Sequence, residues 1–172
     1  RFRFGLDLGC EWKGIDFSMF WQGVAKRDLW LDGPMFWGIS GGEWQSTGLK
    51  EHLDYYRPEN TTSVFGPNTN AYFPKMYMSK DMNQKVQTRY LQNGAYARLK
   101  NIQLGYTFPT QIINKLHMQK LRVYVSAENV LTITSLPSGF DPETTYSSYS
   151  DGNSGKTYPL QTTISFGLNA TF

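Results

Sequence analysis

The residue types that most often carry catalysis or metal binding are few and widely separated in this sequence. Its two histidines, His52 and His117, lie far apart, and its single cysteine, Cys10, belongs to an apolar row. Residues 151–155 (DGNSG) loosely resemble a calcium-binding loop, but the later acidic ligands are missing, and a plain turn explains the segment better. Because Gly-x-Ser-x-Gly elbows, phosphate-binding loops and paired-histidine zinc motifs are also missing, the sequence predicts no enzyme, no cofactor and no metal site.

Aromatic side chains offer a second kind of chemistry, the stacking of flat rings on a ligand. They make up 16% of the chain, and many of them stand in a long aperiodic stretch rich in Gly, Pro, Asn, Ser and Thr. Trp37, Trp44, Tyr55 and Tyr56 are candidates to stack on sugar faces or peptide side chains, because rigid rings give a large contact area at low entropic cost. The alternative for each of them is that it packs the loop onto itself.

Five segments alternate between apolar and polar residues, as β-strands with one apolar and one polar face do. In the last segment Ile164, Phe166 and Leu168 share a face with the terminal Phe172. Phe20 is an exception, since it interrupts a polar face and indicates either a contact of its own or a local bulge. The expected strands are residues 1–12, 14–24, 94–108, 121–133 and 159–172.

The connections between these strands are alternately short and long. Lys13-Gly14 suits a tight hairpin turn, a short connector separates the third and fourth strands, and the other two connections are the long loops 25–92 and 134–158. Antiparallel strands joined in sequence place both long loops at one end of the sheet, which is the layout of an outer-membrane β-barrel. Because small barrels need about eight strands to close, we expect further strands before Arg1.

The overall composition sets limits on other classes of protein. The mean hydropathy of −0.48 and the lack of any run near ~20 apolar residues argue against membrane-spanning helices. A net charge of +3 is too small and too scattered to indicate nucleic-acid binding. Alternation alone suits a soluble sheet equally well, so a soluble all-β carbohydrate-binding module with loop aromatics as its platform stays open as an alternative. An adhesin or a pore barrel without a plug stays open too.

Several motifs, in order along the chain, resemble one family. Residues 90–109 (YLQNGAYARLKNIQLGYTFP) are closely similar to the NGSYLRLKNLTLGYTLP run of SusC/RagA-type, TonB-linked outer-membrane transporters of Bacteroidetes. Residues 121–131 (LRVYVSAENVL), 139–143 (GFDPE) and 158–160 (YPL) resemble the family as well. Residues 56–60 (YRPEN) are similar to the family's WTPENP loop signature, with Arg57 where threonine is usual.

This resemblance implies a fold and a function. The fold would be an antiparallel transmembrane β-barrel of about 22 strands, of which this chain holds the last five or so, with the plug domain and TonB-box upstream. The function would be the import of oligosaccharides or peptides across the bacterial outer membrane, driven by the TonB complex and capped by a SusD-like surface lipoprotein. The loop aromatics would then contact substrate or lipoprotein, and Phe20 would reach the plug. Phe172 would belong to the C-terminal signal read by the barrel-assembly machinery.

Overall fold

A computed structural model describes residues 2–38, 48–77, 81–145, 155 and 157–172. The chain forms two compact units, which we call the sheet unit and the loop unit. The sheet unit comprises Arg1–Arg27, Asn93–Ser135 and Leu160–Phe172, and the loop unit comprises Asp28–Gln92 and Leu136–Pro159. Among the described residues no helix is both long enough and apolar enough to cross a membrane.

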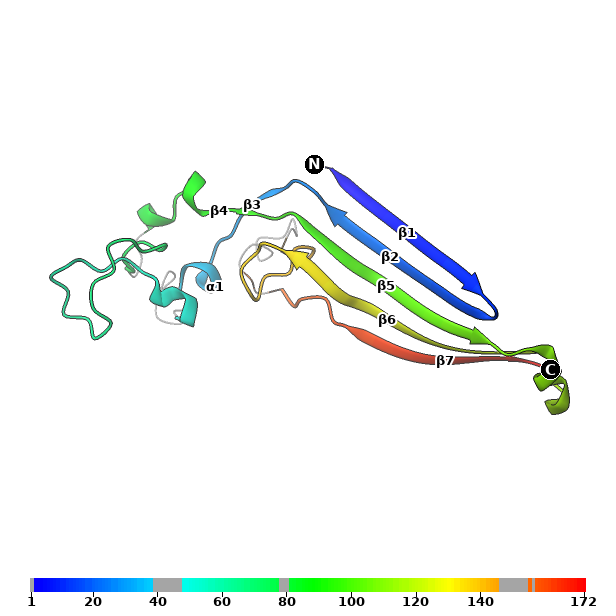
Figure 1. Cartoon of the computed structure of the whole chain (residues 1–172). Coiled ribbons are helices and arrows are strands. Elements are labelled where there is room, and N and C mark those ends of the chain that lie inside the picture. The colour runs from blue at the N-terminus through cyan, green and yellow to red at the C-terminus, as the bar shows by residue number, and fades with distance from the viewer. Residues whose placement is uncertain (1, 39–47, 78–80, 146–154, 156) are drawn as a thin grey trace. The chain divides into compact units, whose positions relative to one another are not determined.

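The sheet unit is built on one five-stranded sheet (Figure 1). All neighbouring strands are antiparallel, and their spatial order β1-β2-β5-β6-β7 follows their order in the chain. This arrangement confirms the expected all-β, antiparallel fold class. The strands are β1 (Arg3–Trp12), β2 (Ile15–Val24), β5 (Tyr96–Thr107), β6 (Lys120–Thr134) and β7 (Thr163–Thr171). A short helix, α2 (Thr110–Ile113), and a 3-10 turn, η4 (Asn114–Leu116), connect β5 to β6.

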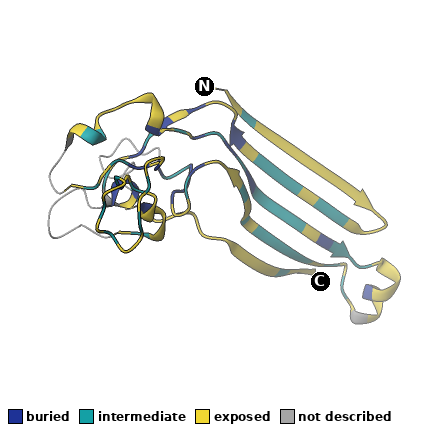
Figure 2. Cartoon of the chain, turned by 60° about the vertical axis from the view of Figure 1, so that its left-hand side comes forward, coloured by how far each residue is buried: buried dark blue, intermediate teal, exposed yellow. Residues whose placement is uncertain are grey.

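The strand register sorts side chains onto two faces. One row across the sheet reads Cys10, Phe17, Leu104, Val125 and Phe166, and the row beside it reads Gly9, Ser18, Gln103, Ser126 and Ser165. Because neighbouring residues of a strand point to opposite faces, the first row lies on an apolar face and the second on a polar face. The apolar face is largely open, with Phe166 84% exposed. Figure 2 accordingly shows these strands mainly in the colours for exposed and intermediate residues.

Two glycines on the polar face make room for side chains of the neighbouring strands. Across Gly105, Arg122 forms an ion pair with Asp16, and its Nε donates to Asp16 Oδ2 at 3.0 Å. The Arg122 guanidinium also lies 4.9 Å from the centroid of the Tyr124 ring. That ring covers Gly167, where a Cβ atom would collide with it. A side chain at either glycine would therefore force this polar cluster apart.

Phe20 lies on the polar face, opposite Asp7 on one neighbouring strand and Asn101 on the other. Its ring comes within 3.4 Å of the position that a Cβ of Gly5 would take, so it fills the space over that glycine. The register between β2 and β5 also shifts directly after Phe20, because Lys100 is an extra residue on β5. The register shift agrees with the local bulge expected at Phe20, and contact with a plug stays a prediction.

The last strand begins later than the sequence suggested. It was expected to start at residue 159, but β7 starts at Thr163. Asn129, in a left-handed conformation with φ 53°, bulges β6 at this level and replaces ladder bonds with side-chain bonds. Its Nδ2 donates to the Gln161 carbonyl at 3.1 Å, and the Thr162 hydroxyl donates to the Asn129 carbonyl at 3.0 Å. The bulge thus ends regular pairing between β6 and the chain before β7.

The loop unit has its own hydrophobic core. Buried residues from both expected long loops form one cluster, which comprises Leu29, Leu31, Phe36, Trp37, Phe73, Tyr90, Leu136 and Phe140. Regular structure is short: β3 (Asp28–Trp30) pairs with β4 (Leu91–Asn93), alongside α1 (Pro34–Trp37), η1 (Lys50–Leu53), η2 (Asp81–Gln84) and η3 (Thr88–Tyr90). The aromatic residues of the aperiodic loops supply much of this core.

The glycine cluster gives a first testable prediction. Gly167→Ala should destabilise the full-length protein by about 1–3 kcal/mol, because the added methyl group must displace the Tyr124 ring. The free energy of unfolding in urea measures this cost. Gly9→Ala is the matched control, since its nearest contact would be the Phe17 carbonyl oxygen at 3.6 Å. Combining Gly167→Ala with Tyr124→Ser should remove most of the cost, and an additive double mutant would contradict the account.

Candidate functional site

The loop unit contains a cavity of about 380 Å³, formed entirely by residues of that unit. Its apolar lining comes from Met35, Phe36, Phe73 and Phe140, with Leu49 and Pro137 beside them. Its polar lining comes from Glu51, His52, Asp54, Tyr72, Gln92 and Ser138. This volume falls in the lower part of the range for small-ligand sites, which makes the cavity the candidate functional site.

Aromatic packing fixes the apolar side of the cavity. The Phe36 ring from α1 meets the Phe73 ring edge to face, with centroids 5.7 Å apart. Behind them Trp37 contacts Tyr90 at 4.9 Å between ring centroids. Burial raises the pKa of the Tyr90 phenol, so this ring stays neutral within the core at physiological pH. The rings therefore present a rigid apolar surface whose position depends on the core of the whole loop unit.

His52 connects α1 to the residue that precedes η1. Its Nδ1 accepts a hydrogen bond from the Leu49 backbone N–H at 2.8 Å, and its Nε2 lies 3.0 Å from the Phe36 carbonyl oxygen. Because Nδ1 acts as an acceptor, Nε2 must carry the proton that is donated to Phe36, and the ring is neutral. The imidazole also packs against Phe73 at 5.3 Å between centroids. His52 is thus a structural clasp with both nitrogens occupied.

Asp54 joins the segment after η1 to the chain near residue 70. Its carboxylate accepts from Asn68 Nδ2 at 2.8 Å and from the Tyr72 backbone N–H at 3.1 Å. Its carbonyl oxygen accepts from the Phe73 N–H at 3.0 Å. These bonds hold Tyr72 and Phe73 at the cavity wall.

Arg57 holds the loop beyond Asp54 together. It is buried, and it donates from Nε to the Gly66 carbonyl at 2.6 Å and from Nη1 to the Leu53 carbonyl at 2.8 Å. Its guanidinium stacks over the Tyr55 ring at 4.7 Å. Arg57 stands where the similar loop signature usually has threonine. Its role here is structural, because its buried guanidinium donates hydrogen bonds to two loop carbonyl groups.

The charge of the cavity lining is one-sided. Glu51 and Asp54 contribute two carboxylates, and none of the described lining residues is a lysine or arginine. Both oxygens of Asp54 already accept hydrogen bonds from the loop. The Glu51 side chain is exposed and has no partner among the described residues. The site therefore combines an apolar surface with an available negative charge.

The four loop aromatics named from the sequence take different places. Trp37 is only 4% exposed and packs in the core, Tyr55 is half-buried beneath Arg57, and Tyr56 is 41% exposed. Trp44 lies outside the described residues. None of the three described aromatics lines the 380 Å³ cavity. A role for any of the four in contacting substrate or lipoprotein stays a prediction.

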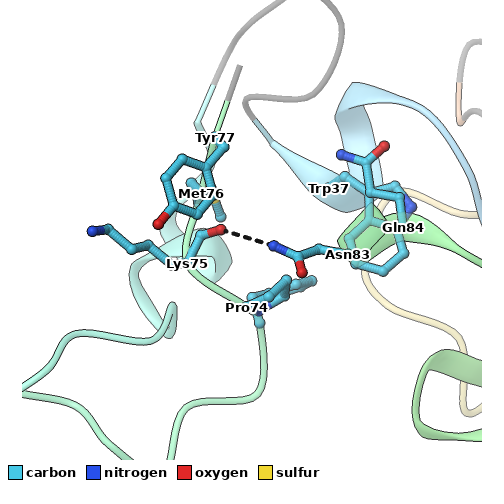
Figure 3. A pocket seen from close by; sticks show the side chains of 8 residues that line it. Trp37, Pro74, Lys75, Met76, Tyr77, Asn83 and Gln84 are labelled. Atoms are coloured by element: carbon cyan, nitrogen blue, oxygen red, sulfur yellow. Dashed lines mark hydrogen bonds between the residues drawn. The ribbon is translucent and has the colours of Figure 1, made fainter. Parts of the chain in front are cut away.

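Trp37 does border a second, much smaller hollow, which Lys75, Asn83 and Gln84 also line (Figure 3). Its volume is about 20 Å³, which is room for a single water molecule rather than a ligand. Asn83 Nδ2 donates to the Lys75 carbonyl at 3.5 Å across it.

The last residue of the chain, Phe172, is 75% exposed. Its expected role in the signal for barrel assembly stays a prediction.

The cavity residues themselves were missed in the sequence. Glu51, Tyr72 and Phe140 stand in aperiodic segments, where no spacing rule brings them together. Phe140 belongs to the GFDPE motif, which marked the segment without indicating its neighbours. The sequence motifs identify the family, but they do not predict the cavity. The cavity forms only when residues of two long loops, far apart in the sequence, pack together.

The His52 clasp gives a second prediction. His52→Ala should lower the local stability of the loop unit by about 1–3 kcal/mol, since the partly buried Leu49 N–H and the buried Phe36 carbonyl lose their partner. Hydrogen exchange of the Leu49 and His52 amides in the full-length protein would measure the loss. His117→Asn is the control, because His117 is exposed and its left-handed φ of 56° suits asparagine. Unchanged exchange in His52→Ala would contradict the clasp.

Comparison with known proteins connects both units to one group. No family model matches the chain. TonB-dependent receptor P3 of Formosa agariphila is 28% identical over 178 residues, which cover 99% of this chain and 16% of that protein. TonB-dependent receptor P26 of the same organism is 25% identical over 175 residues, which cover 98% of the chain and 17% of the receptor. The chain thus spans about one sixth of the length of these relatives.

Solved structures give the same result. The RagAB peptide transporter aligns with a TM-score of 0.68 and 26% identity, over 98% of this chain and 17% of that one. The RagAB peptide importer in its open-open state aligns with a TM-score of 0.64 and 23% identity, over 99% and 17% of the two chains. Both units take part in the match, because it covers nearly all of the chain.

Proposed function

We propose that this chain, a SusC/RagA-like segment of a TonB-dependent transporter, forms part of the barrel wall and the outer loops of a nutrient importer in the bacterial outer membrane. The open apolar face of the sheet carries the proposal. Across the strands, a continuous set of Phe, Leu, Val and Ile side chains is exposed or half-exposed with respect to the described residues. Facing lipid, these side chains are favourably placed, whereas the polar rows face a water-filled or plugged lumen.

The same face disfavours the soluble carbohydrate-binding module. Phe166 is 84%, Ile164 64% and Leu168 63% exposed, and they belong to one contiguous surface. Monomeric soluble proteins rarely expose an apolar patch of this extent. Of the described loop aromatics expected to form a sugar platform, Trp37 is interior and Tyr55 lies under Arg57, so neither presents an open ring face. Relatives named as receptors and importers support a transport role rather than an enzymatic one.

Peptide is the substrate class that we favour over oligosaccharide. The RagAB peptide transporter, which shares 26% identity with this chain over 98% of its length, supports this choice. Transport would depend on the TonB complex through the upstream part of the protein. A SusD-like surface lipoprotein would cover the loop unit. The other expected partners are the lipid of the outer membrane and the barrel-assembly machinery.

An uptake measurement tests the activity. A strain that lacks the full-length gene should lose uptake of fluorescent peptides, and the restored gene should recover it. Collapse of the proton-motive force, which energises TonB, should abolish uptake in the restored strain. Labelled oligosaccharides are the comparison substrate: uptake of these alone would contradict the peptide assignment, and gene-independent uptake of both would contradict the importer.

The orientation of the sheet gives a separate prediction. Ile164 lies opposite Ala127, the middle residue of β6, and its neighbour Ser165 lies on the polar face. Ile164→Arg should cost about 2–4 kcal/mol in the free energy of unfolding from lipid vesicles, because it places a charge in the hydrocarbon region. Ser165→Arg is the matched control and should cost far less. Equal tolerance of arginine at the two positions would refute the lipid-facing assignment.

A further inference from the structure

The cavity of the loop unit has a more specific chemistry than peptide binding in general. We propose that it receives one arginine or lysine side chain of a peptide ligand, an inference that rests on the proposed peptide import. The apolar rings would contact the aliphatic stem, and Glu51 would pair with the cationic group. Such side chains are amphipathic along their length, and few other natural side chains match an apolar wall with a charged rim.

The apolar wall is suited to a flexible stem. Phe36, Phe73 and Phe140 are each at least nine-tenths buried and still border the cavity, so they form its interior surface. Tyr72 is 37% exposed and offers the open part of its ring beside them. A guanidinium or ammonium near that ring gains a further cation–π attraction. The volume of about 380 Å³ suits one long side chain and its backbone rather than an extended oligosaccharide.

The charges determine which ligands are favoured. Asp54 is engaged by Asn68 and Tyr72, so it contributes a negative field while its oxygens remain bound to the loop. Glu51 keeps an exposed carboxylate for a direct ion pair. Among the described lining residues the two carboxylates are the charged groups, so an acidic side chain or an anionic glycan would be repelled by them. The cavity should therefore select for positive charge and against negative charge.

Rigidity of the walls supports binding. His52 links Phe36 to Leu49, and the Asp54 carboxylate binds the backbone N–H of Tyr72. Arg57 binds the carbonyl oxygens of Leu53 and Gly66 in the same part of the chain. Glu51 itself lies in η1, directly beside His52. A site that is already ordered loses little conformational entropy when its ligand enters.

Peptides that differ at one position test this inference. Short capped peptides, uncharged except for a central arginine, methionine or glutamate, would be titrated into the full-length transporter with its lipoprotein by fluorescence anisotropy. Wild type should bind the arginine peptide more tightly than the methionine peptide, and the glutamate peptide least. Glu51→Gln should weaken binding of the arginine peptide about three- to tenfold and leave the methionine peptide unchanged. Glu51→Lys should favour the glutamate peptide over the arginine peptide.

Glu59→Gln is the matched control, because Glu59 is an exposed carboxylate near the same loop that does not line the cavity. It should leave all three affinities unchanged. Equal losses for the arginine and methionine peptides in Glu51→Gln, or no loss at all, would overturn the inference while peptide import stands. Equal wild-type affinities for the three peptides would overturn it in the same way. A transporter that takes up no peptide in the strain assay would instead refute the proposed function itself.

Discussion

The antiparallel ladder of the sheet unit is the constraint on which the rest of the structure depends. Its register aligns apolar residues with apolar residues across every strand, so that one face of the sheet is continuous. A slip of one residue in any pair would move a whole strand's apolar set to the polar face. In lipid, each backbone N–H and C=O group also needs a hydrogen-bond partner within the protein. A sheet that faces lipid therefore needs both paired strands and a uniformly apolar outer face. The inner strands β2, β5 and β6 meet both requirements along nearly their full length, whereas β1 and β7 are the edge strands of this sheet.

Departures from regular alternation occur on the polar face, where large side chains pack over glycines or form ion pairs. Phe20 fills the space above Gly5, and Tyr124 covers Gly167. At Gly105 the missing side chain lets Asp16 and Arg122 meet across the strand between them. The bulges at Lys100 and Asn129 change the pairing of β5 and β6 at the same level of the sheet. These features adjust the polar face and the strand ends while the apolar face stays continuous.

The loop unit is held by a different kind of interaction. Its regular elements are short, and aromatic packing together with a few buried polar bonds replaces a long ladder. His52, Asp54 and Arg57 each bind backbone groups from separate parts of the chain, so that irregular backbone is satisfied internally. The cavity exists because this framework keeps Phe36, Phe73 and Phe140 together while leaving one side open. Loops built in this manner can present a defined binding surface.

The sequence by itself determined the strands, their faces and the order of short and long connections. These are local or nearest-neighbour properties: alternation has a period of two, and turn residues act on their own segment. The resemblance of motifs such as GFDPE and the run at 90–109 also identified the family from the chain alone. Tertiary structure decided the rest. It placed Trp37 in a core rather than on a surface, moved the start of the last strand to Thr163, and brought Glu51, Tyr72 and Phe140 around one cavity. Those outcomes depend on contacts between residues far apart in the chain, for which aperiodic loops carry no spacing signal.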